Sequence, residues 1–567
     1  MRTVSILCLL LLESVSSVCQ SVPQSPSGRT DVPKENATVA GYVFRLDIGE
    51  PIKKARVSLR THATGAFSDF FLTDEQGHFL FNNVPPGAYD LQVSRNGFVD
   101  AEYGQKKPGA PGAILTLVPG QRMTDLVFKL ARAASISGHV FDEDGEPIAR
   151  AGVIAYRASG HSGTEQRASD ERISTNDLGE FRVFDLPPGH YFLAVNYRIQ
   201  DYHGLNSKEE KQRFNPGYLP TYYPNTADPA KAQAIPVNPG DEIRSIDFML
   251  RPAHLVTVSG KVINSIPTTS GATAGKAVRL EPRHPGLADA SPELYDFEQK
   301  DGSFAIRNVP PGSYELVADW QDPQGREWHR VARPLDVGSY DIENLVLTIS
   351  RGVDIPGHVT WEGSPPSDSA LMLRLQAVDE GAFLSPPQRI KADGTFQFKG
   401  VPEGTYRIVL LQLGPAVNLY LKAARYGSAS VADVDFPVQL GTDASLEVIM
   451  SSRAAQLRGT VLNSDSIPAV GAKVLIIPDP PHRDLKSRYL SATTDQNGKF
   501  SMTGISPGDY KLFSWDSVEE SQYRYGEDWF DPNWLKPYET EGQSLHLDEG
   551  DQQSITLKLI YSKTDSP

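Results

Sequence analysis

Short runs in which apolar and polar residues alternate around a central glycine recur along the chain. The first of them is Val39-Ala40-Gly41-Tyr42-Val43. A period of two residues predicts a half-buried β-strand, and the glycine at its centre indicates a close backbone approach or a bulge. The other copies are centred on Gly138, Gly260, Gly357 and Gly459. Since the copies lie roughly a hundred residues apart, we expect each to open one unit of an internal repeat.

A second pattern, Gly-x-Phe followed by Pro-Pro-Gly-x-Tyr, occurs once in each unit. Its clearest copy is Gly77-His78-Phe79 with Pro85-Pro86-Gly87-Ala88-Tyr89. Proline ends a strand, glycine allows the turn, and tyrosine begins the next strand. We expect the tyrosine ring in the core, with its hydroxyl bonded to backbone near the turn, and the phenylalanine as its cross-sheet partner. The other copies, of which the last two are looser, end at Tyr191, Tyr314, Tyr406 and Tyr510.

The strand order is clearest in the second unit, where alternating runs predict seven strands from residues 136–141 to 243–250. Seven short strands with tight turns are typical of a Greek-key sandwich. We therefore predict an all-β fold of five tandem seven-stranded Greek-key β-sandwich modules. The predicted modules are one (37–131), two (132–251), three (252–350), four (351–451) and five (452–561). Because few residues separate them, we expect an extended, semi-rigid array.

Residues 1–19 have the pattern of a signal peptide. A positive start at Arg2 precedes an apolar run too short to span a bilayer and a small-residue stretch suited to cleavage. The two cysteines of the chain, Cys8 and Cys19, both lie here, so a chain cut after Cys19 has no thiol. The alternative is a lipidated Cys19, to which Val18 is a poor lipobox match. Residues 20–36 read as a flexible leader and 562–567 as a polar tail.

Export sets the expected location: extracellular, periplasmic or on the outer surface. No later run is long and apolar enough to predict a transmembrane segment. The formal net charge of −15 would repel phosphate backbones, so nucleic acid is excluded as a partner class.

Three motifs resemble catalytic or metal sites but are better explained by structure. His546 and Glu549 form a His-x-x-Glu pair without a downstream histidine ligand. Residues 504–508 match the Gly-x-Ser-x-Gly nucleophile elbow, but they occupy the turn of the repeat and precede a strand rather than a helix. Acidic turns such as 142–145 are far shorter than a calcium loop. We predict no catalytic residue, no metal site and no cofactor.

A Lys–Asn isopeptide bond between first and last strands would need a lysine in the first strand. Lys261 and Asn344 in module three are the one such pair, and we do not expect a bond there.

Aromatic residues gather in the loops that precede the final strands of modules two and five. Sugar rings stack on tryptophan and tyrosine faces, while nearby acids bond the hydroxyl groups. The candidate carbohydrate-binding residues are Trp529, Trp534, Tyr525, Asp531, Tyr222 and Tyr223. The alternative is that these rings cap an open end of the sandwich or fill a joint between modules, because aromatic rings bury large areas.

The combination of Gly-x-Val, Asp-x-x-Gly-x-Phe and Val-Pro-Pro-Gly-x-Tyr resembles the carboxypeptidase regulatory-like domain. The resemblance covers most of the chain after about residue 37 and is strongest in modules one, two and five. It implies a transthyretin-like (prealbumin-like) sandwich, which is grouped with starch-binding-like folds. The chain also resembles the long arrays found in secreted proteins of environmental bacteria such as acidobacteria. In metallocarboxypeptidases the module is a non-catalytic appendage, so the resemblance implies no peptidase activity.

We therefore predict an exported, non-catalytic binding or scaffold protein. Carbohydrate is the first ligand class to test, with polysaccharide or cell-surface proteins as partners. The alternative is a purely structural or protein–protein adhesion spacer, and a peptidase or hydrolase is the reading that the residues favour least.

Overall fold

The computed structural model describes the chain from Glu35 to Tyr561 with gaps. The described residues are 35–62, 65–158, 166–167, 173–197, 218–252, 255–266, 276–283, 294–296, 301–321, 328–365, 370–378, 385–413, 417–480, 482–516 and 532–561. The predicted signal peptide, both cysteines and the tail lie outside them. Within the described residues the strands form ten sheets, and the prediction of an all-β fold is confirmed.

The sheets fall into successive pairs along the chain, and each pair lies within one of the predicted module ranges. The first sheet of a pair contains the opening strand, and the second contains the strand that begins at the Pro-Pro-Gly turn. A separate buried cluster lies between the two sheets of each pair. This arrangement is a sandwich, in which two sheets bury their facing sides against one another. The module boundaries themselves remain our division of the chain.

Module one has first sheet β4-β1-β8 and second sheet β3-β2-β5, to which β6 and β7 add at β5. Its strands are β1 (Ala37–Arg45), β2 (Arg56–Thr61), β3 (Phe67–Leu72), β4 (His78–Val84), β5 (Gly87–Ser94), β6 (Ala101–Glu102), β7 (Leu115–Leu117) and β8 (Arg122–Leu130).

Module two has first sheet β13-β9-β17 with β18, and a second sheet built on β10 and β14. Its strands are β9 (Ala134–Phe141), β10 (Gly152–Arg157), β11 (Gln166–Arg167), β12 (Ile173–Ser174), β13 (Glu180–Leu186), β14 (Gly189–Asn196), β15 (Thr221–Tyr222), β16 (Ile235–Val237), β17 (Glu242–Ile243) and β18 (Phe248–Met249). The continuous last strand expected over 243–250 is wrong, because the chain bulges at Ser245, which has φ 62°.

Module three has sheets β22-β19-β25 and β21-β20-β23-β24. Its strands are β19 (Val256–Asn264), β20 (Lys276–Pro282), β21 (Leu294–Asp296), β22 (Ser303–Val309), β23 (Gly312–Gln321), β24 (Trp328–Val337) and β25 (Ile342–Ile349).

Module four has sheets β29-β26-β34-β31-β32 and β28-β27-β30-β33. Its strands are β26 (Val353–Glu362), β27 (Ala370–Ala377), β28 (Gln388–Arg389), β29 (Thr395–Val401), β30 (Gly404–Leu413), β31 (Tyr420–Tyr426), β32 (Ala429–Ser430), β33 (Phe436–Val438) and β34 (Leu446–Ser451).

Module five has sheets β38-β35-β41 and β37-β36-β39-β40. Its strands are β35 (Ala455–Leu462), β36 (Lys473–Pro478), β37 (Leu490–Thr493), β38 (Lys499–Ile505), β39 (Gly508–Trp515), β40 (Gln543–Leu547) and β41 (Gln552–Lys558). The short helix α2 (Pro532–Leu535) leads into the 3-10 turn η6 (Lys536–Tyr538).

The central glycine of each opening strand lies against the backbone of the last strand, with which the opening strand pairs in parallel. A Cβ atom added at Gly138 would lie 1.9 Å from the carbonyl oxygen of Ile246, and one at Gly41 would lie 2.2 Å from that of Leu126. Real Cβ atoms do not approach an oxygen so closely, so glycine is required by the close approach that the sequence indicated.

The Pro-Pro-Gly-x-Tyr turn has the predicted geometry in every module. Each tyrosine hydroxyl donates a hydrogen bond to the backbone carbonyl four residues earlier. The bonds are Tyr89 to Pro85 (2.8 Å), Tyr191 to Pro187 (2.6 Å), Tyr314 to Pro310 (3.0 Å), Tyr406 to Pro402 (3.0 Å) and Tyr510 to Ser506 (2.7 Å). The motif therefore builds the core and the turn in each module.

Removing one of these hydroxyl groups gives the first prediction. Tyr510→Phe should lower the unfolding free energy of module five by about 1 kcal/mol, because the partly buried carbonyl of Ser506 loses its donor. Hydrogen exchange of β38 and β39 measures this. The control Tyr340→Phe alters a side chain that is 85% exposed and should change nothing. An equal effect of both substitutions would contradict the structural role.

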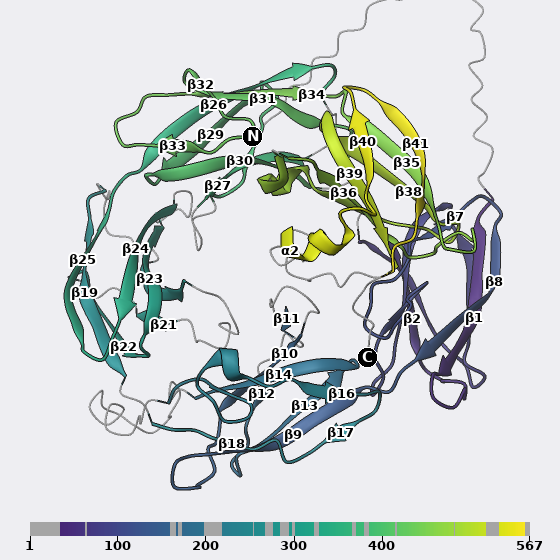
Figure 1. Ribbon diagram of the computed structural model, residues 1–567, viewed down its shortest axis with the longest axis horizontal. Coiled ribbons are helices and arrows are strands. Elements are labelled where there is room, and N and C mark those ends of the chain that lie inside the picture. Colours follow the sequence, from purple (N-terminus) through teal and green to yellow (C-terminus); the bar gives the residue numbers. More distant parts are fainter. Residues whose placement is uncertain are drawn as a thin grey trace, which may run out of the picture.

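The modules do not form a rod but curve into a closed ring, in which module five lies beside module one (Figure 1). The contact is direct: the backbone N–H of Thr116 donates to Oε1 of Gln496 at 3.0 Å, and Ile114 forms an isolated parallel bridge with Asp495. The predicted extended array is therefore wrong. Short linkers limit flexing, but they allow a fixed bend between consecutive modules. Together these bends close the ring.

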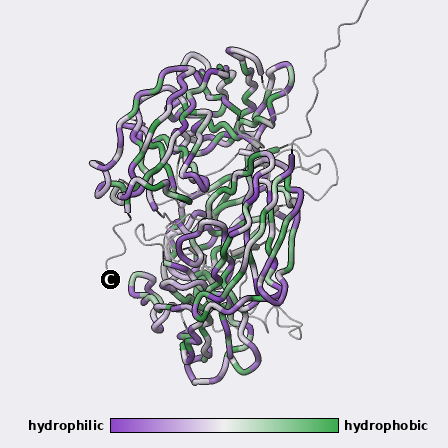
Figure 2. The backbone as a smooth tube through the Cα atoms, turned by 90° about the vertical axis from the view of Figure 1, so that its right-hand side faces the viewer, coloured by the Kyte–Doolittle hydropathy of each residue, from purple (hydrophilic) through white to green (hydrophobic). Residues whose placement is uncertain are grey.

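Within the ring, the first sheets form the outside and the second sheets face the centre (Figure 1). Figure 2 views the ring from the side of module one, where hydrophobic and hydrophilic positions alternate along the strands. One face of each second sheet packs on its own core, and the opposite face is turned toward the four other modules.

Candidate binding surface on the second sheets

The second sheet of module five is buried on both of its faces. Val474 and Ile476 of β36 point into the sandwich core, whereas Leu475 and Ile477 belong to a separate apolar cluster on the opposite face. Side chains alternate along a strand, so a continuous apolar run is what a doubly covered strand requires. Something must therefore cover the face that is turned to the ring centre.

That cover is made by α2 and η6, which follow the aromatic loop of module five. Trp534 and Tyr538 pack on Trp515 of β39, with ring centroids 5.1 Å and 5.6 Å from it. Trp534 is 7% exposed and Tyr538 is 2% exposed. Rings of this size bury large apolar areas, so the packing holds the segment on the sheet.

In module two the aromatic segment joins the second sheet as a strand, because β15 pairs with β14 at the sheet edge. Tyr222 of β15 is 4% exposed and forms a small cluster with Ile154, Tyr156 and Ala194 on the centre-facing side of β10 and β14. Tyr223 is partly buried against the main core of the module. Thus α2 and η6 cover the centre-facing side of the second sheet in module five, whereas in module two Tyr222 contributes its ring to that side from within the sheet.

These positions decide part of the sequence prediction. Trp534 and Tyr222 are buried on sheet faces, an arrangement of the kind that the structural alternative describes. Trp529, Tyr525 and Asp531 lie outside the described residues, and sugar binding by the two loops stays a prediction.

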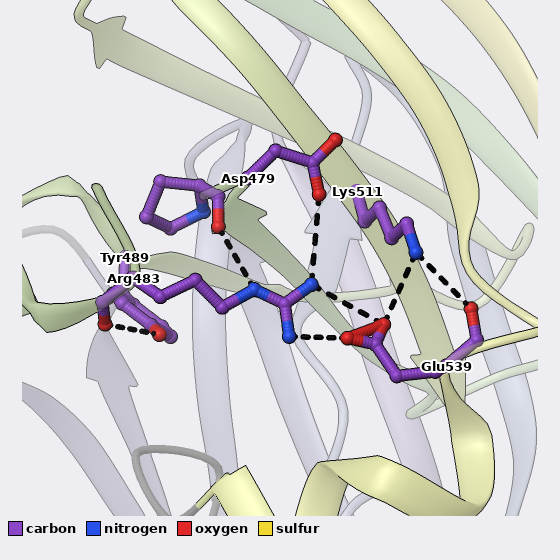
Figure 3. Close-up of polar contacts among 6 residues, drawn as sticks. Asp479, Arg483, Tyr489, Lys511 and Glu539 are labelled. Atoms are coloured by element: carbon purple, nitrogen blue, oxygen red, sulfur yellow. Dashed lines mark hydrogen bonds and ion pairs between the residues drawn. The ribbon is translucent and has the colours of Figure 1, made fainter. Parts of the chain in front are cut away.

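A polar cluster ties the cover of module five to its sheet (Figure 3). The guanidinium of Arg483 pairs with both oxygens of Glu539 and donates to the carbonyl of Pro478 at 3.2 Å. Lys511 of β39 reaches the same carboxylate at 3.1 Å. The hydrogen bond from Arg483 holds the pKa of Glu539 below its usual value, against the opposing effect of burial.

The lowered pKa of Glu539 gives a pH prediction. A carboxyl with a depressed pKa in the folded state adds stability above its unfolded pKa and loses it as the pH falls through the folded value. Acidification should therefore loosen the cover, by about 1 kcal/mol or less because Glu539 is 31% exposed. Hydrogen exchange of β39 at neutral and acid pH measures the change.

The matched variants for this test are Glu539→Gln and Glu146→Gln. Glu539→Gln should give the looser cover already at neutral pH and remove the acid dependence. Glu146 is exposed on a turn of module two and its variant should behave like the wild type. Unchanged acid dependence in Glu539→Gln would contradict the role assigned to this carboxylate.

Module three presents charge on its centre-facing side, which the sequence analysis missed. Arg279 pairs with Asp319 and with Glu281, and Arg330 bonds Glu281 at 2.8 Å. Beneath them Val317 is fully buried. The signal in the sequence was the spacing of two residues between charges along one strand, as between Arg279 and Glu281. This spacing places both side chains on the same face of the sheet. The network covers an apolar residue with paired charges.

The motifs that resemble catalytic sites have structural roles in the part of the chain that the structure describes. Glu549 accepts from the hydroxyl of Ser451 at 2.7 Å and from Lys422 of module four, so it joins two modules. His546 lies 2.7 Å from Asp509, and this hydrogen bond raises its pKa. Ser506 lies in a turn between β38 and β39, and its carbonyl accepts from Tyr510.

The acidic turns use their carboxylates on backbone. Oδ1 of Asp142 accepts from the N–H groups of Asp144 (3.0 Å) and Glu146 (2.8 Å), which is an Asx-type turn. Among the described residues no group of three or more His, Cys, Asp or Glu is placed to hold a metal ion. The same part of the chain has no helix of the length and apolarity that crossing a membrane would take.

The repeat and the paired sheets define a class of tandem β-sandwich proteins. The sequence model of the carboxypeptidase regulatory-like domain matches residues 38–131 and 135–209. Residues 38–131 and 135–209 are thus similar to the carboxypeptidase regulatory-like domain, as the sequence resemblance indicated. For modules three to five the resemblance stays a prediction. Comparison with curated proteins gave no match.

Among solved structures the chain is similar to several surface proteins at low identity. A streptococcal ancillary pilin is 14% identical, with 56% of this chain and 98% of that one covered and a TM-score of 0.18. The Bacillus anthracis TIE protein is 10% identical (76% and 73% covered, TM-score 0.14). The major pilin subunit of Bacillus cereus is 10% identical (75% and 99% covered, TM-score 0.14). Such low scores support no conclusion about this chain.

Proposed function

We propose that the protein is an exported, non-catalytic scaffold that binds a partner on the second sheets of its modules. The observation that carries this proposal is the ring itself, which turns all of these sheets toward one centre. The rings of Trp534 and Tyr538 in module five and of Tyr222 in module two lie on that side, and module three adds its charged network there. Several weak contacts that face one point bind one ligand more tightly than any contact does alone.

Carbohydrate is the ligand class that we propose first. The support is the resemblance to starch-binding-like folds and the presence of Trp529, Tyr525 and Asp531 in the loop that leads to the cover of module five. Binding to an oligosaccharide array should be lost in Trp529→Ala with Tyr525→Ala. The control Tyr340→Ala, in an exposed side chain of module three, should bind as the wild type does.

The second candidate is a structural or protein–protein adhesion spacer. The burial of Trp534 and Tyr222 favours it, because the aromatic residues then serve the fold. A purified chain that binds no glycan on the array would exclude carbohydrate and leave this candidate. Peptidase or hydrolase activity of the purified protein would overturn both proposals.

Export is tested by the mature N-terminus. We propose removal of residues 1–19, and mass spectrometry of the native protein should then find a chain that begins at Gln20. A lipid-modified mass that begins at Cys19 would support the lipidated alternative instead.

A further inference from the structure

We propose that the contact between modules one and five is reversible, so that the ring can open and close there. The contact, which we call the clasp, is made by the side chain of Gln496 in module five with the edge strand β7 of module one.

The clasp consists of one side-chain amide paired with the backbone of one residue. Nε2 of Gln496 donates to the carbonyl oxygen of Thr116 at 2.6 Å, and the N–H of Thr116 donates to Oε1 of Gln496 at 3.0 Å. Thr116 is the middle residue of β7, whose known strand partner is β5. The amide thus takes the place of a neighbouring strand at an edge that is open to pairing.

The turn that carries Gln496 is held in shape by its own aspartate. Oδ1 of Asp495 accepts from the N–H groups of Asn497 (2.8 Å) and Lys499 (2.9 Å), and Asp495 is 9% exposed. Its backbone bridges to Ile114, which fixes the turn against β7. The backbone that carries Gln496 is therefore already held in place by the turn, so little backbone freedom is lost on closure.

The internal repeat shows that module five alone carries the amide in this kind of turn. At the position after the first turn residue, module one has Glu75 and module two has Asp177. A carboxylate accepts hydrogen bonds but donates none, so neither residue could bond the carbonyl of Thr116 as well as its N–H.

The receiving position is equally specific to module one. Thr116 pairs with Ala88, and the positions with the same register in modules two and four are Pro236 and Pro437. Proline has no N–H to donate, and proline on an edge strand is a common protection against pairing. In modules three and five the position holds the charged or titratable residues Asp336 and His546.

The closing interface lacks the covalent linker that holds consecutive modules together. The two hydrogen bonds of Gln496 contribute a preference of roughly 5- to 150-fold for the closed state, beside the backbone bridge between Asp495 and Ile114 and the packing of Gly471 near Gly104. A small cavity remains between the modules, lined by Lys106, Ala110 and Pro111 on one side and by Gly471, Lys473, Thr493 and Asp516 on the other.

The junction of modules four and five differs, because several groups bind there. Arg488 pairs with Asp433 at 2.6 Å, and the N–H of Gly504 donates to Asn418 at 3.0 Å. The contrast indicates that the ring opens first between modules one and five, where no linker joins the modules.

The test is single-molecule energy transfer on the full mature chain, with dyes on Glu50→Cys and Asp465→Cys, two exposed positions in modules one and five. Gln496→Glu keeps the shape of the side chain but removes the donor. It should raise the open fraction about 10-fold or more. Gln76→Glu makes the same change on an exposed turn of module one and should have no effect.

A second variant guards against local misfolding of the turn. Thr116→Pro copies the residue of modules two and four on the other side of the clasp, and it should open the ring equally. Hydrogen exchange of β38 shows whether module five stays folded. The wild type should have a minor, interconverting open population. One static closed population in the wild type and in both variants would overturn the proposal, as would a wild type that is already open.

Discussion

Replacing Gly138 by alanine should destabilise module two by about 3 kcal/mol, because the new methyl group has no room. Its Cβ would lie 1.9 Å from the carbonyl oxygen and 2.4 Å from the carbonyl carbon of Ile246. These are backbone atoms of the segment that joins β17 to β18, so no side chain can rotate away. Relief of this steric clash requires β17 and β18 to separate from β9. That separation breaks the parallel pairing that completes the first sheet.

The matched control for this substitution is Gly338→Ala. A Cβ atom at Gly338 would have no neighbour within 4 Å, and its φ lies outside the left-handed region. Hydrogen exchange should therefore show faster opening of β9 and β13 in Gly138→Ala and no change in Gly338→Ala. If Gly138→Ala were as stable as the control, the close approach of first and last strands would not exist in solution.

Replacing Trp534 by alanine should destabilise the cover of module five by about 3 kcal/mol. The ring is 7% exposed and packs on Trp515, Tyr538 and Leu535 in one cluster. Its removal leaves a cavity over the second sheet and uncovers Leu475 and Ile477. Exposure of the centre-facing side of β36 should follow, and hydrogen exchange of α2 and β39 should accelerate.

The control is Tyr340→Ala, which truncates an aromatic ring that is 85% exposed. It should leave the stability unchanged. This pair of variants separates a structural tryptophan from one that presents its face to a sugar. An aromatic side chain used for binding alone could be truncated without loss of stability. Equal stability of Trp534→Ala and the control would therefore contradict the buried position of Trp534.

The repeated core could be predicted from the sequence because local patterns specify it. The alternation around Gly138 requires a strand with a close neighbour, and the spacing from proline to tyrosine determines which carbonyl the hydroxyl can reach. Both features depend on residues near one another in the chain. The structure accordingly confirms the hydrogen bond from Tyr510 to Ser506 in the least regular copy of the motif.

The structural alternative for the aromatic loops anticipated buried rings, but the sequence held a further signal for the face that they cover. Residues 474–477 are continuously apolar, and a strand buried on one face alone would alternate. Such a run requires a second layer, and the aromatic loop that follows in the chain is the natural source of it. The sequence left Trp534 and Tyr222 open between sugar binding and burial, because composition does not tell which face of a sheet a loop will reach.

The ring could not be predicted, because closure joins positions 380 residues apart. Nothing near Gln496 in the sequence identifies Thr116 as its partner. The rotation at each junction depends on contacts such as that between Arg488 and Asp433, and short linkers are compatible with a rod as well as with a ring. The difference becomes apparent only when the bends of all the junctions are added.

Small-angle X-ray scattering of the mature chain tests the central claim, that the modules close into a ring. A domain of a hundred residues has a radius of gyration of about 13 Å, so five in a ring give about 31 Å and five in a rod about 48 Å. The closed ring predicts the smaller value, with a pair-distance distribution that falls off early. A value near that of the rod in the wild type would contradict the ring.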